Sequence, residues 1–471
     1  MSALQSYFSL LAAAQRRAVP KATRRHVHVS RRPFVVVGYH LAGDVGAPLA
    51  LMWGTNRNER PRVVVVPEPR NRQLRFDALR VFGTEFLAYL EAYDAIQRLP
   101  RSNGSTDSIC ADAPQIVVPN QPTAEWLFGI VGRFTRHLPL TGDPAPDPVV
   151  PLAGKHLSFF HNPLPGSSLV LSATEVLATH WQTGQLPSED LNLSALLGWI
   201  SPSANEDGPA CARAGEMLPP AGPLTDPNWD ASELTELIKE WHAAGADTAA
   251  RGTVMARYEV EIRNQLNHTW EDCWRSLELL EGLQEAPSVV HRWECDRRTW
   301  ARHYEGMMDG TARFRNIPTP VQSARTLRKL EDATSAIKAQ MALDDPLILA
   351  KYVADGEALS ARVIQLDVTQ IRRPLLTLEP LTHFTRPRGT KLFFVTNPEV
   401  SVEILSCAGD CVTAQVTAGA LTKKTSHRLP SVGEEVILSP FGKSTFYPSP
   451  NYDAVPWTHR LDDQQEERID E

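Results

Sequence analysis

Three consecutive long helices are predicted for residues 253–343, and this stretch constrains the fold more than any other part of the sequence. Its apolar residues recur at steps of three and four, the spacing of one face of an α-helix. Pro287 restarts the chain after the first helix, and Pro318 and Pro320 begin the third. The apolar seam of the first helix comprises Tyr258, Ile262, Leu266, Cys273, Leu277 and Leu280. Such seams let helices pack nearly antiparallel, so we expect a helical stalk over residues 231–343.

The charges of this stretch favour a structural role. Residues 253–342 hold 13 basic and 13 acidic side chains, a balance typical of a solvated face and not of a nucleic-acid groove. Four tryptophans, Trp270, Trp274, Trp293 and Trp300, lie at helical spacing and are expected in the core.

Residues 33–201 are predicted to form an α/β domain. Apolar runs at 34–37, 49–53 and 63–66 indicate strands, and the last consists of four valines, which suits a strand buried on both faces. Asn71 is the expected N-cap of an amphipathic helix. Further along, residues 115–118 indicate a strand and 125–138 a helix. Residues 141–154 indicate a loop, and 157–160 with 168–171 indicate a hairpin.

Two places in this domain are candidates for an alternative, enzymatic site. Glu68, Arg70 and Arg72 follow the valine strand, where ligands bind in open α/β sheets and where a helix N-terminus favours an anion. His180 stands beside Trp181 and close to acidic residues, but acid–base catalysis needs a partner in space. The structural interpretation, a rigid connector in the first place and a packed histidine in the second, competes with both.

The flanking segments are defined by composition. Residues 1–32 are a basic lead-in without acidic residues, typical either of a solvated arm or of an organellar targeting peptide. Residues 202–230 hold six prolines and are expected to be a linker. The formal net charge of −7 provides no global field for nucleic acid. Six cysteines without paired spacing and the lack of a long apolar run favour a cytoplasmic protein that does not enter a membrane.

Residues 344–452 are predicted to form a small β-barrel, followed by an acidic tail at 453–471. Six short alternating runs, at 362–368, 375–378, 391–395, 400–406, 412–417 and 435–439, are spaced as in a barrel. Basic side chains gather in the expected loops, and with aromatic residues they suit single-stranded nucleic acid. The predicted contact residues are Arg372, Arg373, Arg386, Arg388, Lys391, Lys423, Lys424, Arg428 and Phe394.

Long helices followed by a small barrel resemble the accessory region that precedes the motor in superfamily 1 helicases of the 1B type. The resemblance covers residues 253–452 and implies a barrel that contacts single-stranded nucleic acid and regulates a motor. The motor itself departs from the pattern. Gly442-Lys443-Ser444 has Ile437 where the phosphate loop needs its first glycine, and prolines at 448 and 450 prevent the required helix.

We therefore expect an α+β multidomain protein with an N-terminal α/β region, a long antiparallel helical stalk and a C-terminal small β-barrel. The favoured function is a non-catalytic accessory protein that binds nucleic acid or supports a separately encoded helicase-type motor. The alternatives are an enzyme with a diffuse N-terminal site and a helical scaffold for a protein partner. The motif search yields no catalytic residue, cofactor or metal site.

Overall fold

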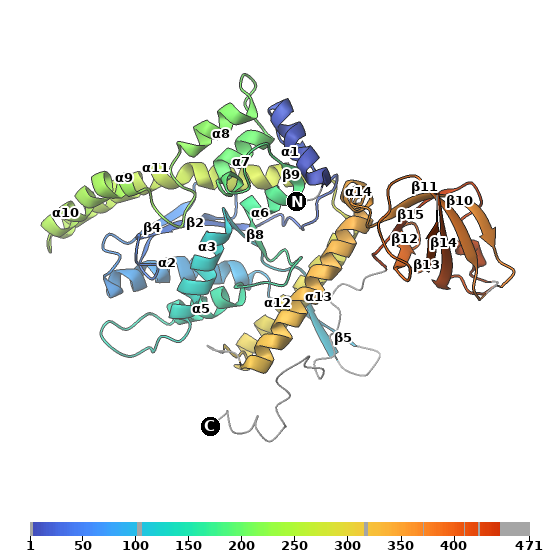
Figure 1. Ribbon diagram of the computed structural model, residues 1–471. Helices are drawn as coiled ribbons and strands as arrows, with labels where there is room; N and C mark the ends of the chain where they lie inside the picture. The colour runs from blue at the N-terminus through green and yellow to red at the C-terminus, as the bar shows by residue number, and fades with distance from the viewer. Residues whose placement is uncertain are drawn as a thin grey trace.

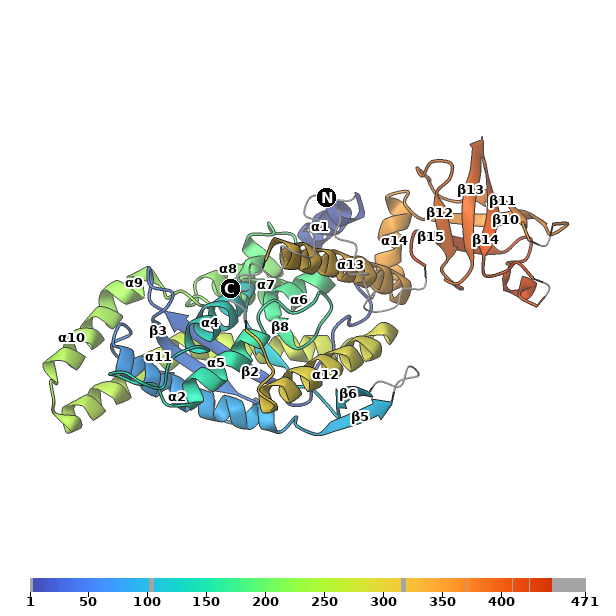
Figure 2. The ribbon, with the colours of Figure 1, turned by 90° about the horizontal axis from the view of Figure 1, so that it is seen from below.

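The computed structural model describes residues 3–100, 106–314, 319–370, 372–408, 410–422 and 424–442. It is an α+β multidomain protein in which a mixed sheet covered by helices is joined to a closed barrel (Figures 1 and 2). Among the described residues, none of the helices combines the length and the apolar character that crossing a bilayer requires.

A five-stranded sheet forms the centre of the N-terminal region, in the order β4-β3-β2-β7-β8. Its strands are β2 Phe34–His40, β3 Pro48–Gly54, β4 Arg62–Val65, β7 Ile116–Val118 and β8 Val170–Ser172. β2, β3 and β4 form an antiparallel meander, and β7 and β8 run parallel to β2. The predicted strands at 34–37, 49–53, 63–66 and 115–118 are thereby confirmed, but β4 is an edge strand in which Val63 and Val64 are only partly buried, so the expectation of a strand buried on both faces is wrong.

Alternating side chains of the strands build two separate cores. Val35 and Val37 point to one face, whereas Phe34 and Val36 point to the other. The Phe34 face is covered by α2 Arg72–Glu91, α3 Gln121–Ala124, the π-helix η1 Glu125–Val131, α4 Gly132–Thr135 and α5 Val149–Phe159. The Val35 face is covered by α6 Ala173–His180, α7 Leu193–Ile200 and α11 Thr248–Glu281.

Short elements complete this region. The lead-in holds α1 Ala3–Gln15 and β1 Val19–Pro20, and β1 pairs with β9 Trp181–Gln182. β5 Ile96–Pro100 and β6 Thr106–Cys110 form a ribbon. The stretch predicted as a linker contains α8 Gly208–Glu216 and α9 Pro227–Trp229. The remaining short helices are η2 Glu189–Leu191, η3 Asp230–Leu234 and α10 Thr235–Ala243.

The hairpin predicted from residues 157–160 and 168–171 is wrong, although its second strand exists as β8, and the loop predicted over residues 141–154 is wrong beyond Pro148. Residues 149–159 form α5, whose buried Val150, Ala153 and Leu157 repeat with helical spacing. Gly154 lets α5 approach α4, since a Cβ there would overlap Thr135 Oγ1 and lie 2.6 Å from the backbone nitrogen of Arg136. Proline and aspartate upstream hid the helix, because they dominate the composition of 141–148.

The three predicted long helices exist, but an antiparallel stalk is not confirmed. They are α11, α12 Pro287–Met308 and α13 Pro320–Asp344. The seam of α11 belongs to the core on the Val35 face, and Trp293 and Trp300 of α12 belong to the core on the Phe34 face. The tryptophans therefore have the expected core role. The apolar seams pack mainly on the sheet and its helices, and Figure 2 shows α11 running along the body.

The C-terminal region forms the predicted barrel. Six strands close in the order β10-β11-β14-β13-β12-β15, and every pair is antiparallel. They are β10 Leu359–Asp367, β11 Leu375–Pro380, β12 Lys391–Phe394, β13 Ser401–Ala408, β14 Cys411–Ala418 and β15 Glu435–Ser439, with the short helix η4 Ser426–Arg428 before β15. α14 Pro346–Ala354 joins α13 to the barrel (Figure 1). The acidic tail lies outside the described residues.

Candidate nucleic-acid interface

Glu68 and His180 do not share a site. Glu68, Arg70 and Arg72 follow β4, and His180 ends the helix that follows β8. These two strands are the opposite edges of the sheet, four strand spacings apart, which is about 19 Å. The predicted alternative site is therefore wrong as a single site, because the sheet separates the loop after β4 from His180.

The loop after β4 is a helix cap. The Asn71 side chain accepts hydrogen bonds from the N–H groups of Gln73 and Leu74, at 3.0 and 3.2 Å, which confirms its predicted role. Arg70 Nε lies 3.8 Å from Asp44, and the guanidinium of Arg72 lies over the ring of Phe76. Arg70 and Arg72 thus contact neighbouring side chains at the protein surface.

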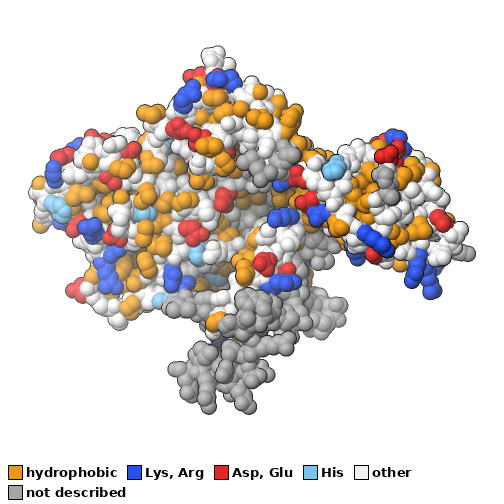
Figure 3. Space-filling view, viewed as in Figure 1, with side chains coloured by type: hydrophobic (Ala, Val, Ile, Leu, Met, Phe, Trp, Pro, Cys, Tyr) orange, Lys and Arg blue, Asp and Glu red, His pale blue; other side chains and the backbone are white. Residues whose placement is uncertain are grey.

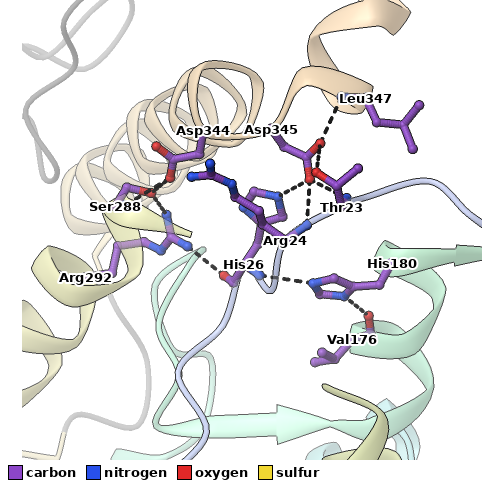
Figure 4. Close-up of polar contacts among 10 residues, drawn as sticks. All are labelled: Thr23, Arg24, His26, Val176, His180, Ser288, Arg292, Asp344, Asp345 and Leu347. Atoms are coloured by element: carbon purple, nitrogen blue, oxygen red, sulfur yellow. Dashed lines mark hydrogen bonds and ion pairs between the residues drawn. The ribbon is translucent and has the colours of Figure 1, made fainter. Parts of the chain in front are cut away.

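His180 is buried and uses both ring nitrogens (Figure 4). Nδ1 donates to the carbonyl of Val176 at 2.7 Å, and Nε2 accepts from the backbone N–H of His26 at 3.0 Å. Burial lowers the pKa of His180 to about 4. A neutral imidazole with both nitrogens occupied positions the chain and has no free nitrogen for proton transfer.

A partly buried polar network continues from His180 along residues 23–26. Asp345, the N-cap of α14, accepts from the N–H groups of Thr23 and Arg24 at 2.6 and 3.0 Å. From the other side, Arg292 of α12 donates to the carbonyl of His26 at 2.6 Å (Figure 4). The N-terminal segment is therefore held between helices that come more than 260 residues later in the chain.

The carboxyl ends of the parallel strands, where α/β enzymes commonly bind ligands, are covered by the chain itself. The carbonyl of Pro223 accepts from the N–H of His40 at 2.8 Å, and that of Gly222 accepts from Asn120 at 2.9 Å. Gly222 has a φ of 97°, and a Cβ there would lie 2.6 Å from the carbonyl of Gly38. Residues 220–223 therefore occupy this edge of the sheet.

The residues predicted to contact nucleic acid lie at two opposite ends of the barrel. Strand directions alternate around the barrel, so the loops after β10 and β14 lie at one end and the loop after β11 at the other. Arg372, Arg373, Lys424 and Arg428 belong to the first end, whereas Arg386, Arg388 and Lys391 belong to the second. Figure 3 shows basic side chains at separate points of the barrel. Lys423 lies outside the described residues.

Three of the predicted contact residues, Phe394, Arg386 and Arg428, are buried or paired with acidic side chains. Phe394 is 2% exposed inside the barrel core, so its prediction as a stacking surface is wrong. Arg386 pairs with Glu357 at 2.7 Å, and Arg428 pairs with Glu399 at 3.0 Å. Arg372, Arg373, Arg388, Lys391 and Lys424 remain exposed.

A hollow with a volume of about 870 Å³ lies between α12, α13 and the loop after α5. Arg298 is one of the lining residues and is paired with Asp107 and Glu294. Three further basic side chains, Arg302, Arg313 and Lys329, line the hollow together with the rings of Phe159, His303 and Phe314. We call these six residues the cation–aromatic groove. Within the described parts of the chain, none of the three basic groups has an acidic partner; Arg302 bonds only to Arg298 O and Thr299 Oγ1.

The electrostatics of the groove favour an anion. Burial lowers the pKa of Lys329, and the nearby charge of Arg302 lowers it further. The one carboxyl at the floor, Asp296, is 1% exposed and accepts from the N–H of Ser168 at 2.7 Å. Burial raises the pKa of Asp296 to about 7, which limits its ability to neutralise the cations. An anionic ligand would relieve the repulsion between Arg302 and Lys329.

The aromatic rings of the groove pack against one another. The rings of Phe159 and His303 are stacked, with centroids 3.9 Å apart and an interplanar angle of 15°. His303 Nε2 lies 3.1 Å from His156 Nδ1. Burial lowers the pKa of His303 to about 3. The ring of Phe314 contacts His303 edge-on at 6.4 Å. The groove thus offers neutral π-surfaces beside positive charge.

Comparison with known protein families, with characterised proteins and with solved structures finds no significant match to this chain. Among the described residues, no group of three His, Cys, Asp or Glu side chains is arranged to hold a metal ion. The functional inference therefore depends on the geometry of the groove and of the barrel.

Proposed function

We propose that this protein is a nucleic-acid-binding accessory protein that holds a single strand in the cation–aromatic groove. The observation that carries the proposal is the set of three basic side chains without acidic partners beside stacked rings. Phosphates would contact Arg302, Arg313 and Lys329, and bases would stack on the exposed ring surfaces. This combination of charge and stacking is how proteins bind single strands without reading sequence.

The barrel would extend the interface. Arg372, Arg373 and Lys424 share one end and are exposed, so they can contact the backbone of a longer strand. A separately encoded helicase-type motor remains the proposed partner, because long helices precede a barrel here as in the accessory region of those enzymes. In this proposal α12 and α13 form the walls of a binding site in place of a free antiparallel stalk.

The test is fluorescence anisotropy with labelled oligothymidine and oligouridine of about 12 nucleotides, within the size range of single-strand sites. Arg302→Glu combined with Lys329→Glu should weaken binding at least tenfold, because two phosphate contacts become repulsive. Arg302 and Lys329 are both exposed residues, so the variant should fold. An unchanged thermal midpoint would confirm this.

The matched control carries the same charge change elsewhere. Arg60→Glu with Lys239→Glu reverses two exposed basic residues that already have acidic neighbours, Glu259 and Glu236. This variant should bind like the natural protein. Equal affinities for the two double variants, or no binding at low salt by the natural protein, would refute the groove as a nucleic-acid site.

A further inference from the structure

A second pocket lies where the N-terminal helix meets the helix that leads into the barrel. It has a volume of about 260 Å³ and lies between α1, α13 and α14. Figures 1 and 2 both show α1 beside α14. Its apolar lining comes from Leu4, Phe8, Met341, Leu347 and Ile348.

Three lysines, Lys21, Lys338 and Lys351, line the same pocket. They come from the segment after β1, from α13 and from α14, so the tertiary fold brings them together. In the described portion of the structure, none of the three forms an ion pair with an acidic side chain. The backbone N–H of Lys21 donates to the carbonyl of His180 at 2.9 Å, which fixes the start of its side chain.

The positive charge at this pocket is compensated only in part. Burial lowers the pKa of Lys21; Asp190 partly opposes this, and Lys351 lowers the pKa further. Asp190 is occupied with Thr183 and Gln185, from which its Oδ1 accepts hydrogen bonds at 2.7 and 2.9 Å. Lysine stems often cover apolar surface while the ammonium stays in water. Three of them around one apolar cavity, with no carboxylate between them, form a more specific arrangement.

We propose that this pocket binds a small amphipathic anion, with a carboxylate or phosphate head between the lysines and a short apolar tail against α1, α13 and α14. The head would relieve the repulsion between Lys21 and Lys351, and the tail would cover apolar side chains that now line an open cavity. The bound molecule would bridge α1 and α14. It would therefore fasten the helix that carries the barrel to the body.

The experiment uses the full chain and four probes with the same alkyl chain: octanoate, octyl phosphate, octylamine and 1-octanol. Isothermal titration and thermal unfolding are measured for each. We expect saturable binding of octanoate or octyl phosphate with an increase in the unfolding temperature, and at least tenfold weaker binding of octylamine and octanol. Whichever anion binds more tightly identifies the head group. Equal binding of octanol and the anions, or no saturable anion binding, would overturn the proposal.

Variants locate the site. Lys338→Gln with Lys351→Gln removes two charges from exposed side chains and should weaken octanoate binding at least tenfold without changing the unfolding temperature of the free protein. Lys239→Gln, on α10, is the control and should leave binding unchanged. If the control and the double variant bind octanoate equally, the anion is held elsewhere and the assignment is wrong. This measurement needs no nucleic acid and is independent of the groove.

Discussion

Asp345 Oδ2 accepts a hydrogen bond from the backbone N–H of Thr23 at 2.6 Å, although the two residues are 322 positions apart. Asp345 also accepts from the Thr23 hydroxyl at 3.0 Å and caps α14 through the N–H of Leu347 at 2.9 Å. One fully buried carboxylate thus joins the start of the chain to the helix that leads into the barrel.

Asp345→Ala is expected to destabilise the protein by about 3–5 kcal/mol. The substitution removes a cap and leaves the partly buried N–H groups of Thr23 and Arg24 without acceptors, each costing about 1–3 kcal/mol. Asp247→Ala is the matched control, because Asp247 caps α11 in the same way but is exposed. Its expected cost is about 1 kcal/mol. Urea unfolding of both variants tests this difference, and equal costs would contradict the importance assigned to burial.

Acid should destabilise the fold through its buried histidines. Burial lowers the pKa of His180 and of His156 to about 4, whereas an unfolded histidine titrates near 6.5. Between these values the unfolded chain binds more protons, so stability is full above about pH 6.5 and falls as the pH drops toward 4. At about 1.4 kcal/mol per pKa unit, His180 alone contributes a loss of about 3 kcal/mol by pH 4.

His180→Gln should flatten this pH dependence while lowering stability at neutral pH. The check is urea unfolding of both proteins at pH 7.5 and at pH 5.0. Asp296 acts in the opposite direction, because its pKa is raised to about 7 by burial, so its contribution declines as the pH rises from about 4 to 7. A natural protein more stable at pH 5.0 than at pH 7.5 would show that Asp296 outweighs the histidines.

At more strongly acidic pH, Asp345 should contribute a second loss of stability. Burial alone would raise the pKa of Asp345, but hydrogen bonds from His26, Leu347 and Thr23 together hold it below its usual range. Its contribution is therefore present above about pH 4, the unfolded value, and is lost as the pH falls further. The Asp345→Ala variant should lack this second phase in an acid titration followed by circular dichroism.

Salt should weaken nucleic-acid binding in proportion to the groove's phosphate contacts. Each contact to a single strand contributes about −0.7 to the slope of log affinity against log salt, so three contacts predict a slope of about −2. Arg302→Gln should reduce its magnitude by about 0.7. Anisotropy titrations at several salt concentrations measure this. A slope near zero in the natural protein would exclude phosphate contacts at the groove.

Stacking can be tested separately from charge. Phe314→Ala removes a groove ring that also lies under Arg136, 5.9 Å from its centroid. The expected loss of affinity is about 1–3 kcal/mol, the range for one stacked base, with an unchanged salt slope. Phe314→Tyr keeps the ring and should restore binding. If the tyrosine variant binds as poorly as the alanine variant, stacking is not the role of this ring.

The two ends of the barrel should differ in their contribution. Charge reversal of Arg372 and Arg373 should weaken binding of long oligonucleotides more than of short ones, since this end is proposed to extend the groove. The same reversal at Arg386 and Arg388, at the opposite end, serves as the control. Equal effects of the two reversals would mean that the barrel acts only through its overall charge.

Local patterns predicted much of the secondary structure. Asn71 was identifiable because an N-cap acts within three residues of itself, and alternation in the barrel strands reports directly which side chains face inward. The seam of α11 was also correct, since Tyr258, Ile262 and Leu266 are buried. Periodicity gives the buried face of a helix but not its partner. The same spacing of apolar residues is compatible with packing on a neighbouring helix and with packing on the sheet that α11 covers.

The groove could not be predicted for a related reason. Its basic residues lie within a stretch of balanced charge, because acidic residues such as Glu294 and Asp332 pair with Arg298 and Arg328 instead. A count along the chain mixes these paired charges with the unpaired ones. Phe159 enters the groove from α5, more than 140 residues before Arg302, a connection that follows only from the packing of helices on the sheet.

The contact between Thr23 and Asp345 also has a consequence for synthesis. At roughly 5–20 residues per second, a ribosome adds residue 345 about 15–60 s after residue 23. The strands from β2 to β8 have all left the ribosome well before then, so the sheet can assemble while residues 23–26 still lack their acceptor. The last step in ordering the N-terminal segment is therefore timed by the appearance of α14, and a nascent chain that stalls before this helix would carry that segment unsecured.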